Sequence, residues 1–244
     1  MKTLREVYDE VYDAEDLLSP IVLRPDALST TRYDDAARLL RNERGRLLEL
    51  GGATGRLTVA LAPFFDELVC TDLSESMINV GRQHVERSYP DVAAKIRMLV
   101  ASAGEPLPFP DCSFDVVVAS AVLEHVLFLF QAMDEAARVC RPGGCVVLTV
   151  PNLAYVKNVI DLIRGRLPIT GLAGVDPLDM ATIRRLGWDG HHLHYFTRSS
   201  LGALLEHVGF RPEEWTGDGR YARLRRWSTN LVGNLTVRAR RTIR

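Results

Sequence analysis

The feature that most restricts the fold of this chain is a regular alternation of short, β-rich runs with longer segments of helical periodicity. The strand-like runs cover residues 45–50, 67–71, 96–100, 114–120 and 145–150, and helical segments such as 74–86 and 127–139 lie between them. Parallel strands need a crossover connection, usually a helix, and this requirement produces such an alternation. The sequence therefore predicts an α/β fold in which helices cover both faces of a parallel sheet.

The rest of the chain suits additions to that sheet rather than a second domain. A length of 244 residues can be filled by one α/β domain. We expect a helical cover in residues 1–44, the core in 45–152, and a Gly- and Pro-punctuated lid or substrate wall in 153–190. Residues 191–244 are expected to add a last helix, 197–208, and two terminal strands, 210–216 and 234–240.

Charge is nearly balanced overall but concentrated at one end. The formal net charge is −1, which gives no sign of a nucleic-acid-binding protein. Between Gly219 and Arg244, however, stand eight arginines and no acid. A helical stripe of Leu224, Trp227 and Leu231 beside these arginines could contact an anionic membrane or a lipid-linked substrate, but a solvated face beside an edge strand is the simpler interpretation.

Cysteine usage and the N-terminus both indicate a reducing compartment. The cysteines lie in or beside apolar strand-like runs and form no CxxC pair, so buried free thiols are expected at Cys70, Cys112, Cys140 and Cys145. The N-terminus, MKTLREVYDE, lacks the apolar segment of a signal peptide, and no apolar run reaches the roughly 18 residues of a membrane span. We expect a cytoplasmic protein.

A glycine-rich turn, LLELGGATG at residues 47–55, follows the first predicted strand and precedes a helix. Glycine lets the backbone bend sharply and approach a ligand, and the helix start adds N–H groups that can bind it. Many nucleotide-binding folds share this turn. A dinucleotide fingerprint would need glycines at 51, 53 and 56, whereas the chain has Ala53 and Arg56. The pattern therefore disfavours a nicotinamide-dependent dehydrogenase.

The turn and the motifs after it resemble those of the class I S-adenosylmethionine (SAM)-dependent methyltransferases. Glu49 stands two residues before the first glycine, as an acid does in that family, where Gly51 and Gly55 would line the methionine end of the cofactor. Ala53 replaces a residue that is commonly glycine. SAVLEHV at 120–126 and RPGGCVVLTVPN at 141–152 resemble the small-molecule branch. The resemblance implies a doubly wound, Rossmann-like sheet of seven strands with a C-terminal antiparallel strand.

Two further segments correspond to the ribose and adenine ends of that cofactor. Asp72 ends the second predicted strand just before Ser74, a helix N-cap. An ionised carboxylate there can accept both hydrogen bonds of a ribose diol, although a solvated acid is the alternative. In the third motif, ASAGEPLPFPDCSFDVVVAS, Ser102 stands where the family usually has an acid, so the adenine contact would rest on its hydroxyl and on the backbone of Ala103 or Gly104.

The resemblance also implies further cofactor-lining residues, namely Leu73, Met77 and Ser120. In the expected N-terminal cover, Tyr33 is the aromatic residue best placed to reach the cofactor, but a core or surface role is favoured for it.

Methyl transfer to oxygen or nitrogen requires the acceptor to lose a proton, and histidine is the natural base near neutral pH. His125, at the mouth of the fourth predicted strand, is either such a base or a residue that props the loop. Of the histidines that follow the predicted lid we favour His192, because the family often has a histidine near this point.

Those later histidines could also be interpreted as a metal cluster, formed by Asp189, His191, His192 and His194. Adjacent residues of an extended segment point to opposite faces, so only His192 and His194 would share a face. The segment therefore does not predict a compact metal site, and no metal is expected.

The sequence thus predicts SAM-dependent methylation of a small molecule, with S-adenosylhomocysteine as the other product. O-methylation of a sugar, a lipid-linked glycan or a secondary metabolite is the leading interpretation, because PNLAYVKNVIDLIRGRLPIT and HLHYFTRSSL are similar in outline to enzymes with such substrates. The alternatives are a quinone-type C- or O-methyltransferase and a protein that binds SAM without transferring its methyl group.

Overall fold

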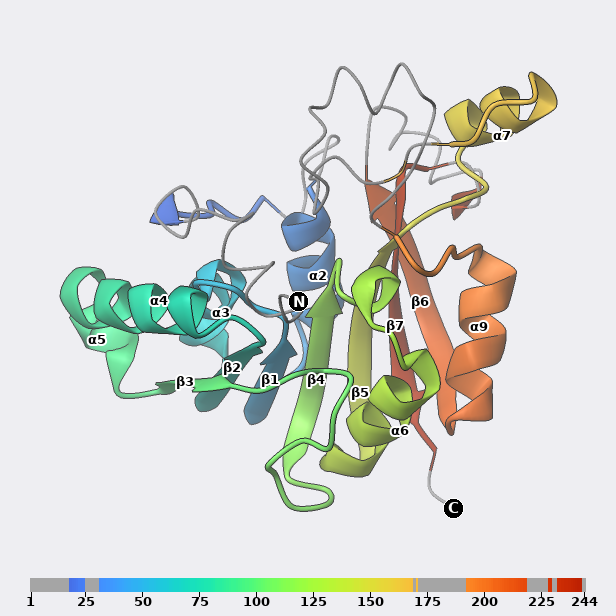
Figure 1. Ribbon diagram of the computed structural model, residues 1–244. Coiled ribbons are helices and arrows are strands. Elements are labelled where there is room, and N and C mark those ends of the chain that lie inside the picture. The colour runs from blue at the N-terminus through green and yellow to red at the C-terminus, as the bar shows by residue number, and fades with distance from the viewer. Residues whose placement is uncertain are drawn as a thin grey trace, which may run out of the picture.

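A computed structural model describes residues 18–24, 31–168, 170, 192–218, 228–229 and 232–242. Within these residues, one seven-stranded sheet contains β1 (Arg46–Leu50), β2 (Glu67–Asp72), β3 (Ile96–Val100), β4 (Phe114–Ser120), β5 (Cys140–Pro151), β6 (Phe210–Asp218) and β7 (Asn234–Arg241). The strand order is β3-β2-β1-β4-β5-β7-β6, as Figure 1 shows. β7 runs antiparallel to both of its neighbours, and the other neighbouring pairs are parallel. The predicted fold class is therefore confirmed.

The central strands are apolar because both of their faces are buried. In β5, Cys145 and Val147 contribute to the hydrophobic cluster on one face of the sheet, while Val146 and Leu148 contribute to the cluster on the other. All four side chains are buried. Successive side chains of a strand point to opposite faces, so a strand covered on both sides needs a continuous apolar run.

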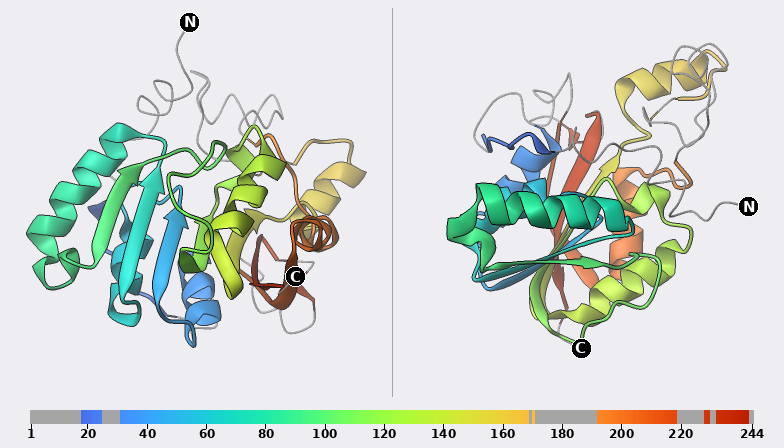
Figure 2. Two further views of the ribbon diagram at one scale, coloured as in Figure 1. Left: turned by 90° about the horizontal axis from the view of Figure 1, so that it is seen from below. Right: turned by 60° about the vertical axis from the view of Figure 1, so that its left-hand side comes forward.

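Helices cover both faces, as the alternation predicted. α2 (Arg32–Leu40) and α3 (Arg56–Leu61) pack in the first cluster, and α4 (Glu75–Ser88) covers Cys70 and Met98. α6 (Leu129–Val139) and α9 (Arg198–His207) pack in the second. The left panel of Figure 2 shows α2 and α6 on opposite sides of the sheet. Shorter helical elements complete the described part: η2 (Ala62–Phe64), α5 (Pro90–Ala93), η3 (Leu123–His125) and α7 (Val156–Ile163).

Two predicted helix ends are confirmed by their local geometry. The Ser74 hydroxyl accepts a hydrogen bond from the Met77 N–H at 3.1 Å and so caps α4. After α9, Gly209 has a φ of +87°, the left-handed conformation that ends a helix most easily at glycine. These two residues set where the chain turns back toward the sheet.

Three expectations need correction or lie outside the described residues. Cys112 is exposed, unlike the other cysteines, because it occupies a turn before β4 at a φ of +55°. Of the predicted lid, residues 153–168 and 170 are described, and α7 extends away from the sheet (Figures 1 and 2). The predictions for Asp189, His191, Leu224, Trp227 and Leu231 concern positions outside the described residues. In the described part, no helix is long and apolar enough to cross a membrane.

Some of the C-terminal arginines form ion pairs on the sheet. Arg240 contacts Glu43 at 2.7 Å and Glu213 at 3.1 Å, and Arg238 contacts Glu214 at 3.4 Å. Glu43 lies between α2 and β1, and the other two acids belong to β6, so the positive charges of Arg238 and Arg240 are balanced locally. Contact of the basic C-terminus with a membrane or a lipid-linked substrate stays a prediction.

Candidate functional site

A cavity of about 780 Å³ opens at the carboxyl ends of β1, β2 and β4. It lies beside the point where the sheet order reverses, since the chain passes from β1 to β2 on one side and later places β4 on the other. Connections that leave neighbouring strands toward opposite faces create a crevice, which is where open α/β sheets bind ligands. The volume is in the usual range for small-molecule and cofactor sites, about 300 to 1,000 Å³.

The glycine-rich turn forms one wall of this cavity. Gly51, Ala53 and Gly55 have φ values of +64°, +50° and +77°, so the backbone is left-handed at every second residue. A Cβ atom at position 51 would lie 2.5 Å from Cγ2 of Val122, in the loop after β4. Glycine is therefore required at position 51 both by the backbone conformation and by the packing.

Gly55 has a different position from the one that the resemblance implied. It does not line the cavity but stands at the N-cap of α3, where its N–H donates to the Gly52 carbonyl at 2.8 Å. Its left-handed conformation lets the chain turn from the glycine-rich loop into α3. The contribution of Gly55 to binding would be indirect, through the shape of the turn.

Asp72 connects the turn to the start of α4. One carboxylate oxygen accepts from the Ala53 N–H at 2.8 Å, and the other accepts from the Ser74 N–H at 2.9 Å. The side chain is only 7% exposed, and it lines the cavity. The alternative of a solvated acid at a strand end is therefore wrong for this residue.

Glu49 lies beneath the same turn and also lines the cavity. It is buried, and its carboxylate accepts a hydrogen bond from the Thr58 hydroxyl of α3. Burial raises the pKa of Glu49 to about 7, because the charged form is poorly solvated there, and the Thr58 hydroxyl offsets part of this effect. The acid that matches the family motif is thus a structural support as well as a cavity residue.

The remaining predicted cofactor residues, Leu73, Met77, Ser102, Ala103 and Ser120, all line the cavity. The Ser102 hydroxyl accepts from the Gly104 N–H at 3.2 Å, so it shapes the loop as well as facing the cavity. The Ser120 hydroxyl oxygen is buried and has no hydrogen-bond partner among the described residues. A buried hydroxyl without a partner is unfavourable, so it fits a cavity whose ligand supplies one. Gly51, Asp72, Ser102 and Ser120 define what we call the turn end of the cavity.

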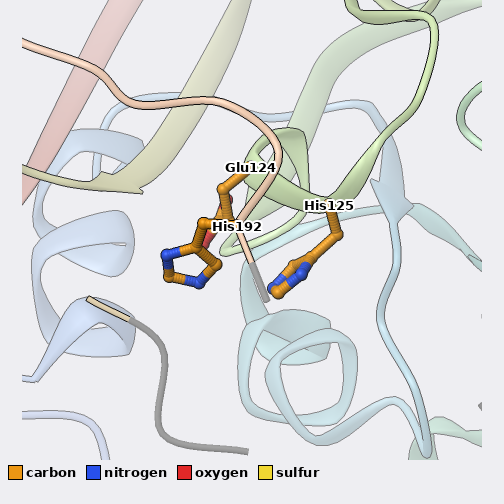
Figure 3. A group of neighbouring side chains, drawn as sticks. All are labelled: Glu124, His125 and His192. Atoms are coloured by element: carbon orange, nitrogen blue, oxygen red, sulfur yellow. The ribbon is translucent and has the colours of Figure 1, made fainter. Parts of the chain in front are cut away.

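The opposite part of the cavity, the histidine end, is formed by Glu124, His125 and His192. One ligating atom from each of these side chains lies within 4.8 Å of the other two. The two imidazole rings are 4.9 Å apart between centroids and meet edge to face. Figure 3 shows Glu124 and His125 extending from η3 while His192 comes from a separate segment.

Hydrogen bonds hold that separate segment against η3. The N–H groups of Leu193 and His194 both donate to the Glu124 carbonyl, at 2.7 and 3.3 Å. The Nε2 atom of His194 is 2.7 Å from the Val126 carbonyl, so this histidine has a structural contact and does not line the cavity. On the other side, Nδ1 of His192 lies 2.5 Å from the Thr170 hydroxyl. The predicted pair His125 and His192 is thus brought together across 67 positions of sequence.

Glu124 was not predicted as a site residue. Its side chain is 1% exposed, and its Oε2 atom has no hydrogen-bond partner among the described residues. Burial raises its pKa to about 7. Its place directly before His125 in SAVLEHV was the only sequence signal, and an acid in that position gives no sign of being buried.

Other cavity residues were also missed, among them Arg32, Gly52, Thr54, Arg56, Gln131 and Asn234. Tyr33, for which a core or surface role was favoured, lines the cavity too. Arg32 and Tyr33 belong to the first turn of α2, and the expectation that Tyr33 is the aromatic residue best placed to reach the cofactor did not extend to Arg32.

The fold and the site together define a class. The strand order, the antiparallel β7, the glycine-rich turn after β1 and the acid at the end of β2 are those of the class I, Rossmann-like methyltransferases. Residues 48–148 match the family described as a methyltransferase domain. Together, the fold and this match support a class I SAM-dependent methyltransferase.

Curated relatives are consistent with that assignment. The chain is 32% identical over 167 residues to a ubiquinone/menaquinone biosynthesis C-methyltransferase, UbiE, of Coxiella burnetii. A UbiE protein of Vibrio vulnificus is 34% identical over 119 residues. The first match covers 65% of this chain and 64% of the relative, so the chain spans just under two thirds of that relative's length.

Solved structures share the fold at low sequence identity. The [4+2]-cyclase SpnF superimposes with a TM-score of 0.68 at 16% identity, over 99% of this chain and 96% of that one. A SAM-dependent methyltransferase of Methanosarcina mazei gives a TM-score of 0.60 at 20% identity, over 82% and 93%. The architecture is therefore common to enzymes whose names describe different reactions.

Proposed function

We propose that this protein transfers a methyl group from SAM to an oxygen atom of a small molecule. The observation that carries the proposal is a single cavity that joins the predicted cofactor residues at the turn end to two histidines and a buried acid at the histidine end. A methyltransferase of this kind needs both halves within reach of one another, because the acceptor must meet the methyl group directly.

The turn end would hold the cofactor. Gly51 and Ala53 present backbone to the methionine part, Asp72 accepts from the ribose diol, and Ser102 with Ala103 borders the adenine. The unpartnered Ser120 hydroxyl gains a hydrogen bond when the cavity is filled. When bound, SAM supplies a methyl group activated by its attachment to a positively charged sulfur.

The histidine end would prepare the acceptor. The enclosing residues exclude water and hold the acceptor oxygen in line with the methyl group, which can lower the barrier by several kcal/mol, on the order of 7 to 11 at best. The acceptor hydroxyl must also lose its proton. His125 and His192 are the imidazoles that line this part of the cavity in the described residues, so they are the groups to which that step is assigned.

A quinone-type acceptor is the second candidate. Two observations favour it: the curated relatives are quinone C-methyltransferases, and apolar side chains border the cavity. Leu127 and Phe128 line the cavity yet are 64% and 60% exposed, so they offer an apolar edge to a hydrophobic ring or tail. Such an acceptor would be methylated on carbon or on oxygen.

Thermal unfolding with three ligands tests the cofactor half of the proposal. S-adenosylhomocysteine, SAM and NAD are each added at about a hundredfold excess over a plausible dissociation constant. A ligand of the native state then adds about 2.7 kcal/mol, which for this size raises the midpoint by roughly 5 to 10 °C. We expect the shift with both sulfur compounds and none with NAD. A shift with NAD alone would refute the proposal.

Isotope-labelled SAM then tests transfer. The protein is incubated with hydroxylated sugars, phenols and hydroquinones, and the label is located in the product by mass spectrometry and NMR. Label on oxygen supports the leading proposal, and label on a quinol ring carbon supports the second candidate. Binding of S-adenosylhomocysteine without transfer to any acceptor would favour a protein that binds the cofactor for another purpose.

A further inference from the structure

We propose that Glu124, His125 and His192 form a binding site for one divalent transition-metal ion at the histidine end of the cavity. The proposal rests on the proposed function for its role in catalysis, but the ion-binding site itself stands on the geometry of the three side chains.

The ligand set is of a known chemical kind. Two imidazoles and one carboxylate bind first-row divalent ions such as Zn²⁺ and Mn²⁺ and leave further coordination positions open, whereas Mg²⁺ prefers oxygen ligands and retained water. The three ligating atoms lie within 4.8 Å of one another. Ligands at adjacent positions around one ion are about 3 Å apart, so side-chain rotations that shorten these separations by up to about 1.8 Å would complete the site.

Glu124 supplies an independent reason to place an ion there. A side chain that is 1% exposed and holds a carboxylate oxygen without a partner in the described part of the chain is an unfavourable arrangement. A cation between that oxygen and the two imidazoles would satisfy it. A buried acid that served only to support the loop would be expected to have a donor on each oxygen.

Contacts around the ligands resemble those that orient metal-binding histidines. The Thr170 hydroxyl lies 2.5 Å from Nδ1 of His192. A hydrogen bond to one ring nitrogen fixes the orientation of an imidazole that binds an ion through the other nitrogen. The two N–H groups of Leu193 and His194 that bind the Glu124 carbonyl hold the segment of the third ligand next to the first two. The site is thus assembled by backbone hydrogen bonds that do not use the ligating atoms.

Such an ion defines the class of acceptor. Its open positions would bind a hydroxyl oxygen and lower the pKa of that hydroxyl, as a bound divalent ion does for water. With His125 and His192 as ligands, the ion would take over from the imidazoles the task of promoting loss of the acceptor proton, which would leave to solvent. The oxygen lone pair forms the new O–CH₃ bond, and the S–CH₃ bond breaks with its electron pair kept by sulfur. Acceptors with two adjacent hydroxyls would be preferred, because both oxygens can coordinate one ion.

The test measures ion binding directly and needs no turnover. The protein is freed of metal by dialysis against a chelator and titrated with Mn²⁺, and the loss of the free-ion signal is followed by electron paramagnetic resonance. Mn²⁺ has little affinity for the exposed thiol of Cys112, which would complicate a titration with Zn²⁺. We expect one Mn²⁺ per chain, displaced by Zn²⁺ and not by an equal concentration of Mg²⁺.

Variants assign the ligands. Glu124→Gln and His192→Ala should each weaken Mn²⁺ binding at least about tenfold, and Thr170→Val should weaken it less, while His84→Ala, a histidine of α4 outside the cavity, should not change it. The far-ultraviolet circular dichroism spectrum, measured on every variant, shows that the fold is intact. Unchanged Mn²⁺ binding in Glu124→Gln and His192→Ala would overturn the proposal.

Other outcomes are equally decisive. A protein that binds S-adenosylhomocysteine but no Mn²⁺ or Zn²⁺ refutes the metal site and leaves the proposed function standing. A protein that binds the ion through these residues but neither SAM nor its product keeps the metal site and refutes the proposed function.

Discussion

The turn end and the histidine end of the cavity are built in different ways. At the turn end, the groups that face the ligand are held by backbone conformation and by short-range hydrogen bonds, as at Gly51 and Asp72. At the histidine end, side chains from η3 and from a segment almost seventy residues later must converge. Under the proposed function, the turn end holds the cofactor, and the histidine end can be altered to change the acceptor.

The largest expected effect is a loss of turnover without a loss of cofactor affinity, which would distinguish the role of the histidine end from that of the turn end. His125→Ala should lower turnover by about 10²- to 10⁴-fold, which is the usual contribution of a general acid or base. It should leave S-adenosylhomocysteine affinity within threefold. Steady-state kinetics and calorimetric titration measure the two quantities. His84→Ala is the control. If His125→Ala lost cofactor affinity as severely as turnover, the two ends would not be separable.

The second prediction concerns backbone conformation at the turn end. Gly51→Ala should weaken S-adenosylhomocysteine binding by about 100-fold and destabilise the protein by about 3 kcal/mol, since it adds left-handed strain and a clash with Val122. Gly143 provides a matched control, because its φ is +75° and an added Cβ would meet nothing within 4 Å. Gly143→Ala should cost about 1 kcal/mol and leave binding unchanged. Calorimetry and urea unfolding would test both variants, and equal effects would refute the role of the clash.

The third prediction uses the raised pKa of Glu49. The native protein keeps a proton on this acid up to about pH 7, whereas the unfolded chain releases it near 4.5. The native state therefore binds more protons between these values, and the free energy of unfolding falls as pH rises through that window, by up to about 3 kcal/mol. Below 4.5 and above 7 the contribution is constant.

Glu49→Gln isolates this contribution. Urea unfolding at pH 5, 6, 7 and 8 should show the variant gaining stability relative to the wild type as pH rises. Asp218, whose pKa burial raises to about 6, changes stability in the same window but does so equally in both proteins. Parallel curves for the two proteins would mean that Glu49 is ionised in the native state at pH 5.

The smallest expected effect is on binding of the ribose part of the cofactor. Asp72→Asn should weaken S-adenosylhomocysteine binding by about 10- to 100-fold, which corresponds to the roughly 1.5–3 kcal/mol of hydrogen bonds to a charged group. The amide keeps one oxygen for the backbone donors and turns an NH₂ group toward the other. Asp91→Asn, an exposed acid of α5, serves as the control in the same calorimetric titration. A loss below threefold would remove Asp72 from cofactor recognition.

The same difference explains what could be predicted from sequence. The strands, the Ser74 cap, the glycine-rich turn and the acid at position 72 follow from local signals such as apolar runs and the residue types at strand ends. The antiparallel direction of the C-terminal strand and the places of Leu73, Met77 and Ser120 were implied by the family resemblance. Asp72 could be predicted because it ends a strand whose neighbours are fixed by the sheet, and Ser120, which the resemblance supplied, also ends a strand. Their positions depend on few long-range contacts.

The histidine end could be predicted only in part. His125 and His192 were chosen by chemistry and by resemblance, and the structure places both on the cavity. Glu124 was missed, since its burial depends on how the segment around Leu193 lies over η3. Arg32 was missed and Tyr33 was named only as the aromatic residue best placed to reach the cofactor, because the direction of α2 relative to the strands is set by packing and not by its own periodicity.

The Glu124 carbonyl has a consequence for how such a domain can be modified. It accepts the N–H groups of Leu193 and His194, and a backbone carbonyl accepts from any residue except proline. The hydrogen bonds that attach the segment of Leu193 and His194 to η3 therefore do not depend on which side chains that segment carries. A segment of other length and composition, exchanged from a homologous domain, could attach at the same oxygen, so that new acceptors can be recruited by recombination while the cofactor half is inherited unchanged.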